Sequence, residues 1–176
     1  PNGTPGTVVR FKADNVIDFA WAADPDFVEE TFDVDGVTLR LVHQANPELD
    51  SNWTALGDYA ARAMAFINDD IGPYMYQAYN VIQGGDGGME YPMLTLVTGE
   101  RSLRSLVGVT VHEMAHSWFQ AMGATHESLH EWRAEGFASW AEPRCMAALV
   151  ADPTTPPQRP HQAVWRRRGA TRPGRT

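Results

Sequence analysis

Two histidines four residues apart constrain the fold of this chain more than any other feature. Residues 111–116 read V-H-E-M-A-H, within a stretch, 105–122, whose apolar residues recur at helical spacing and which Gly123 ends. Residues i and i+4 differ by about 40° around a helix, so the imidazoles of His112 and His116 can converge on one metal ion. Glu113 points about 100° away from His112, so its carboxylate can stand beside the ion as a general base without binding it. A metal-free surface pair or core pair is the alternative.

A catalytic zinc site keeps three protein ligands and one open position, so a third ligand must come from elsewhere in the chain. Glu135 is the candidate, because it follows His116 after 18 intervening residues, early in a third predicted helix from about 128 to 149. Two antiparallel helices would place it opposite the histidines, and Gly136 permits their close approach. Other side chains compete on distance alone: Glu127, Glu131, Glu142, His126 and His130. For the two competing histidines, a solvated loop is the simpler interpretation.

The rest of the chain predicts strands around one earlier helix. Two alternating runs, 27–34 and 37–43, are joined by Asp-Gly, the strongest short hairpin signal, and 8–22 also indicates extended chain. A helical pattern starts at Trp53 and stops at the Gly-Pro of 72–73. Two more strand-like runs, 75–83 and 92–98, flank a glycine-rich turn where the backbone can approach a neighbour closely. Strands, helix, strands and two helices predict an α+β fold.

Length and composition exclude several classes of protein. The chain has 176 residues, 43% of them hydrophobic, which is enough for one core and short for two ordinary domains. No apolar run approaches the roughly 18 residues of a membrane span, so we expect no transmembrane segment. The single cysteine, Cys145, excludes an internal disulfide framework. The chain opens with Pro1 and shows no export signal, so we expect a soluble protein, and the sequence leaves its compartment open between cytoplasm and export.

The formal net charge of -8 is unevenly distributed. Residues 1–143 hold 21 acidic and 7 basic side chains, whereas 144–176 hold 1 acidic and 7 basic. The acidic body argues against nucleic acid as a partner, because a polyanion needs a basic surface, and it suits cationic ligands. Residues 151–176 lack the apolar surface that would offset the entropy of ordering, so we interpret them as a disordered basic tail. An arm for anionic surfaces is the alternative interpretation of this tail.

The two histidines, the 18-residue interval and Glu135 followed by Gly-Phe-Ala resemble the gluzincin zinc aminopeptidases of the membrane alanyl and puromycin-sensitive type. These proteins carry a second motif, Gly-x-Met-Glu-Asn, and residues 87–91 here read G-G-M-E-Y, some 20 residues upstream of the histidines. Tyr91 replaces the usual Asn, and Ala134 replaces the Asn common before the third ligand. Neither change removes a ligand. The resemblance covers about residues 13–148.

The resemblance implies a thermolysin-like catalytic domain over 23–150, with 1–22 as the end of a preceding β-rich domain. It implies Zn2+ held by His112, His116 and Glu135, with Glu113 taking the proton of the activated water and passing it to the leaving amine. Glu90 would bind the free α-amine of a peptide, which confines cleavage to the N-terminal residue. Two neighbours of Glu90 would line the substrate strand by backbone pairing: Gly88 and Met89.

Three further expectations concern activity and surroundings. In the family a tyrosine downstream of the third ligand stabilises the oxyanion, and 136–176 contains no tyrosine, so we expect a truncated and weakly active aminopeptidase. A zinc endopeptidase, or a non-catalytic metal-binding relative that acts as an interaction module, is the alternative. The sequence does not fix the oligomeric state or the side-chain preference. We interpret the large side chains around the site as core rather than recognition surface: Trp118, Phe119, Trp132, Phe137, Trp140, Met114 and Met122.

Overall fold

The first two strands form the predicted hairpin. The structure, a computed structural model, describes residues 10–85 and 87–151. Strand β1 (Phe27–Val34) pairs antiparallel with β2 (Val37–Gln44), and the turn residues Asp35 and Gly36 both have positive φ, 54° and 84°. Positive φ at both central positions is what a two-residue hairpin turn with the right twist requires, and it explains the Asp-Gly pair.

Three more strands complete a mixed sheet in the order β1-β2-β3-β5-β4. Strands β3 (Ala78–Gly84) and β5 (Leu94–Thr98) run parallel to β2, and β4 (Gly88–Tyr91) pairs antiparallel with β5 at the edge. The sequence predicted a glycine-rich turn before 92 but not the strand β4. Residues 10–22, the described part of the run predicted to be extended, contain no strand.

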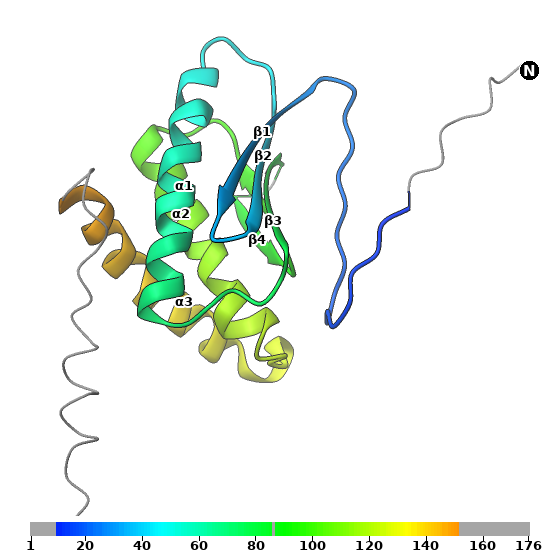
Figure 1. The fold of residues 1–176 in the computed structure, drawn as a ribbon, viewed down its shortest axis with the longest axis vertical. Coiled ribbons are helices and arrows are strands. Elements are labelled where there is room, and N and C mark those ends of the chain that lie inside the picture. Colours follow the sequence, from blue (N-terminus) through cyan, green and yellow to red (C-terminus); the bar gives the residue numbers. More distant parts are fainter. Residues whose placement is uncertain (1–9, 86, 152–176) are drawn as a thin grey trace, which may run out of the picture.

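The helices gather on one side of this sheet, as Figure 1 shows. They are α1 (Asp50–Asp70), α2 (Leu103–His116), a π-helical turn η1 (Ser117–Ala121) and α3 (Glu127–Ala151). Ser102 caps α2 by accepting from the backbone N–H of Ser105. The main core lies between the sheet and the helices, and it includes Leu39, Leu41, Trp53, Leu56, Met64, Ile67, Tyr79, Leu106, Val111 and Met114. This α+β arrangement agrees with the predicted fold class.

Helix α3 runs back along α2 and is bent near its start, where His130 has the non-helical angles φ -141° and ψ 39°. Small side chains line its buried face: Ala134, Ala138, Ala141 and Cys145. Arg144 ties α3 to the end of α1, since its Nη2 lies 3.0 and 2.9 Å from the two carboxylate oxygens of Asp70. The predicted basic tail, 151–176, lies outside the described residues except for Ala151, which ends α3.

The buried face of α3 is lined by small side chains, so one expectation about the aromatic residues has to be corrected. Trp132 is 69% exposed, and Phe137 and Trp140 are each 46% exposed, so the interpretation of these three as core is wrong. Alanines and a cysteine occupy the positions that contact α2, so the aromatic residues fall on other faces of the helix. Trp118 and Met114 are buried as predicted, and Phe119 and Met122 pack half-buried against the core. Within the described residues, every helix is too short or too polar to span a bilayer.

Candidate metal centre

The two imidazoles of α2 converge as their spacing predicts. The Nε2 atoms of His112 and His116 lie 3.3 Å apart, and their ring centroids are separated by 5.0 Å. His116 is fully buried, whereas His112 is partly open to solvent. Two nitrogen donors therefore face one small volume at the carboxyl end of α2, where the hydrogen-bonding pattern widens into the π-helical turn η1. Such turns are frequent at functional sites.

Glu135 on α3 completes the group. Its Oε2 lies 3.3 Å from Nε2 of His112, and its Oε1 lies 3.6 Å from Nε2 of His116. One ligand atom from each of these three residues lies within 4.8 Å of the other two. Two imidazole nitrogens and one carboxylate oxygen are a donor set that catalytic zinc uses, and a fourth position stays open for water or substrate. The residues present therefore fit a zinc ion.

The competing candidates are not brought together in this way. In the described part of the chain, the groups able to hold a metal include none of Glu131, Glu142, His126 and His130. The side chain of Glu127 lies outside the described residues. A second group, which shares His116, consists of Glu90, Glu113 and His116. It borders the first group and supplies the carboxylates discussed next.

Glu113 stands beside the histidines and is only 7% exposed. Burial, followed by the negative charges of Glu90, Glu135 and Glu142, raises the pKa of Glu113 to about 8. A hydrogen bond with Glu90 favours the protonated form further. A carboxyl group whose pKa lies near neutrality can both accept and return a proton, which is what a general base in hydrolysis must do.

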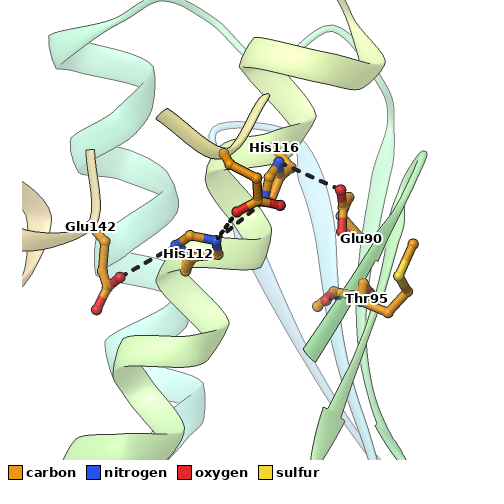
Figure 2. A network of polar contacts seen from close by, with 7 residues as sticks. Glu90, Thr95, His112, His116 and Glu142 are labelled. Atoms are coloured by element: carbon orange, nitrogen blue, oxygen red, sulfur yellow. Dashed lines mark hydrogen bonds and ion pairs between the residues drawn. The ribbon is translucent and has the colours of Figure 1, made fainter. Parts of the chain in front are cut away.

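Strand β4 runs alongside α2 and carries the three residues predicted to contact substrate. The Oε1 of Glu90 lies 3.6 Å from Nδ1 of His116, and Figure 2 shows the two side chains pointing toward each other. Thr95 on β5 donates its hydroxyl to the carbonyl oxygen of Met89 at 3.0 Å, which fixes β4 against β5. Gly88 faces Glu113, and a Cβ at position 88 would lie 2.9 Å from the Glu113 Cδ. The strand can approach α2 this closely because position 88 has no side chain.

Part of this chain is similar in sequence to known aminopeptidases, and its fold is similar to that of a solved metallopeptidase. Leucine aminopeptidase 2 of Ajellomyces capsulatus is 34% identical over 96 residues, which cover 51% of this chain and 15% of that protein. Aminopeptidase B of Homo sapiens is 34% identical over 88 residues, 45% of this chain and 13% of that protein. The M1 zinc metallopeptidase of Deinococcus radiodurans superposes with a TM-score of 0.53 at 24% identity, over 72% of this chain and 29% of that chain. This part of the chain resembles the gluzincin aminopeptidases.

The matched part of this chain spans 15% and 13% of the length of the two sequence relatives named above. No family model matches it. The likeness to the Deinococcus structure concerns the fold, because the sequence identity is low. The mixed sheet with its helices is thus a fold that this chain shares with that structure over 72% of its length.

One contact of His112 was not predicted as such. The Oε2 of Glu142 lies 3.3 Å from Nδ1 of His112, the ring nitrogen on the side away from the metal group. The sequence suggested Glu142 only as a competing ligand. A usable signal was present, because Glu142 follows Glu135 by seven residues, about two helical turns, and therefore shares its face of α3.

Two cavities flank the histidines. One, of about 320 Å³, is lined by acidic side chains of β4 and α3: Glu90, Glu131 and Glu135. The other, of about 810 Å³, lies between the start of α2 and the end of α3, and it reaches His112 and Glu142. A ligand can therefore approach the metal group from two sides, and the side with Glu90 is negatively charged.

Proposed function

We propose that this chain is the zinc-binding part of an aminopeptidase that removes N-terminal residues from peptides. The observation that carries the proposal is the convergence of His112, His116 and Glu135 beside the buried carboxyl group of Glu113. Similarity to known aminopeptidases supports the reaction class. The finer assignment to a thermolysin-like catalytic domain over 23–150, preceded at 1–22 by the end of a β-rich domain, is part of the same proposal.

The protein side chains divide the chemistry between them. A zinc ion at this site would polarise a peptide carbonyl and lower the pKa of a water molecule. Glu113 would accept the proton of the attacking water and deliver it to the leaving amine. Its position supports this role, because the carboxyl group is buried beside His116, one of the proposed ligands.

Glu90 would select the N-terminus of the substrate. Its carboxylate lies at the acidic cavity together with Glu131 and Glu135, and such a lining favours an ammonium group over a neutral amide. Strand β4 is the last strand of the described sheet, so its outer edge has no strand partner among the described residues. A peptide can therefore pair with the backbone of Gly88 and Met89 as an added strand.

Weak activity of this chain is part of the proposal. No tyrosine follows Glu135 in the sequence, and Tyr74 and Tyr79, upstream, are buried in the core. The loss of one oxyanion donor lowers turnover about a hundredfold to a thousandfold in enzymes of known mechanism. Binding of zinc is therefore the first property to measure.

Metal analysis of the wild type against Glu135→Ala, with Glu131→Ala as control, tests the zinc site. We expect one zinc per wild-type chain, the same for Glu131→Ala, and much less for Glu135→Ala. Equal zinc content in all three proteins would overturn the assignment of Glu135.

The second test compares an aminoacyl anilide with its N-acetylated form as substrates. Preference for the free amine, lost in Glu90→Gln, supports an aminopeptidase. Equal hydrolysis of both substrates would favour a zinc endopeptidase. Bound zinc without hydrolysis, in a longer parent protein as well, would favour a non-catalytic interaction module.

A further inference from the structure

The imidazole of His112 lies between two carboxylates of the same helix. Its Nε2 is 3.3 Å from Oε2 of Glu135, and its Nδ1 is 3.3 Å from Oε2 of Glu142. Figure 2 shows the Glu142 carboxylate on one side of the ring, with the contacts to the metal group on the other. About two turns of α3 separate the two carboxylates, roughly 10 Å along the axis, and one ring fills that gap.

This position has a consequence for the protonation of the ring. A neutral imidazole carries one N–H and one lone pair, and the partner of one nitrogen decides which nitrogen holds the proton. Carboxylates face both nitrogens of His112, but with a zinc ion at Nε2 the N–H would lie on Nδ1, where the Glu142 carboxylate can accept it. The lone pair then lies on Nε2, the nitrogen that faces His116 and Glu135. Metal-binding histidines commonly have such a carboxylate behind them, which orients the ring and raises its basicity.

The backbone around Glu142 is held in place on both sides. Ala141 and Cys145 are buried against the rest of the protein, and Arg144 pairs with the carboxylate of Asp70. The carboxylate of Glu142 itself borders the 810 Å³ cavity and is partly exposed. Helix packing thus fixes the position of residue 142 without its side chain being part of the core, so the side chain can be changed while the fold remains.

We propose that Glu142 is a positioning residue of the zinc site: it holds His112 in the Nδ1–H tautomer and strengthens metal binding without touching the metal. The proposal rests on the zinc site proposed above. Loss of such an outer carboxylate typically weakens metal binding about 10- to 100-fold, so we expect this loss for Glu142→Ala. Glu142→Gln keeps an oxygen that accepts from Nδ1–H, so it should lose less.

The test titrates zinc into each variant of the full chain against a competing chelator. Glu135→Ala reports on the proposed ligand, and Glu131→Ala is the matched control, because it removes an exposed carboxylate from the same helix. We expect zinc affinity to decrease in the order wild type and Glu131→Ala, Glu142→Gln, Glu142→Ala, Glu135→Ala. If Glu142→Ala binds zinc like Glu131→Ala while Glu135→Ala does not, the role of Glu142 is overturned and the metal site stands. If Glu135→Ala also binds like wild type, the metal site itself fails.

A second measurement covers the case in which Glu142→Ala folds poorly. Proton spectra of the zinc-loaded protein show whether the Nδ1–H of His112 is hydrogen-bonded. We expect its resonance to lie far downfield and to exchange slowly with water in the wild type, less so in Glu142→Gln, and to be broadened by exchange in Glu142→Ala. A rapidly exchanging Nδ1–H of His112 in the zinc-loaded wild type would overturn the proposal, whatever the zinc affinities are.

Discussion

The carboxyl groups of Glu113 on α2 and Glu90 on β4 lie side by side, although both residues are acids: their oxygens and a ring nitrogen of His116 are within 4.8 Å of one another. Two ionised carboxylates at such a distance repel each other, and a proton on one of them removes this repulsion. Burial and the neighbouring negative charges raise the pKa of Glu113 to about 8, so Glu113 holds this proton in the metal-free protein near neutral pH.

This proton makes the stability of the metal-free protein depend on pH. The pKa of Glu113 rises from 4.5 to about 8 on folding, so above pH 4.5 the unfolded chain releases a proton that the folded chain keeps. The stabilisation is therefore present at low pH and is lost as the pH rises through about 8. We expect Glu113→Gln, which stays neutral, to gain about 2 kcal/mol or more over wild type between about pH 5 and pH 9.

Urea unfolding in the presence of a chelator measures this difference. Glu131→Gln is the control, because it removes an exposed carboxylate of the neighbouring helix and should follow the wild type at every pH. Parallel stability curves for wild type and Glu113→Gln would show that Glu113 is ionised in the folded protein throughout this range, contrary to the expectation.

The close approach of β4 to α2 predicts that Gly88 tolerates no side chain. A Cβ at position 88 would lie 2.8 Å from Cγ2 of Val109 and would overlap the carboxyl group of Glu113. We expect Gly88→Ala to lower the free energy of unfolding by about 1–3 kcal/mol, the range for overpacking. Gly87→Ala is the matched control, because its Cβ would meet only Nη2 of Arg101, at 3.5 Å. Equal stability of the two alanine variants would contradict the close packing at Gly88.

The convergence of the two histidines could be predicted because helix geometry fixes it. The spacing of His112 and His116 places them on one helix face whatever the rest of the fold does, and the family resemblance indicated Glu135. The hairpin was equally accessible, since Asp35 and Gly36 tolerate the positive φ that the turn needs.

The missed features depend on long-range contacts. Strand β4 has only four residues and is stabilised by its pairing with β5. That pairing cannot be seen in the local sequence, whose glycines indicated only a turn. The exposure of Trp132 and Trp140 follows from which face of α3 packs on α2, and their hydrophobicity alone suggested burial. Glu142 could have been found from its seven-residue spacing to Glu135, but only once two helices were assumed to pack side by side.

The pair of Arg144 and Asp70 predicts how firmly α3, and with it Glu135, is held. The carboxylate of Asp70 is only 5% exposed, and Nη2 of Arg144 lies 3.0 and 2.9 Å from its two oxygens. Arg144→Met leaves this buried charge without that partner, so we expect a loss of about 2 kcal/mol in thermal or urea unfolding. The double variant Asp70→Asn with Arg144→Met should recover part of the loss. The control is Arg133→Met, on the exposed face of α3. If Arg133→Met lost as much stability as Arg144→Met, the prediction would be wrong.

The thiol of Cys145 provides a probe of the packing between α3 and the core. Cys145 is fully buried, and burial raises the pKa of its thiol to about 12, so almost no reactive thiolate is present at pH 8. We expect a thiol reagent to modify the native protein on the order of a thousandfold more slowly than the chain unfolded in urea. The control combines Cys145→Ala with Ser128→Cys, which moves the single thiol to an exposed position near the start of α3 and should react at once. If the wild-type thiol reacted as fast as this control under native conditions, α3 would not be packed on the core. The placement of Glu135 opposite the histidines would then be wrong as well.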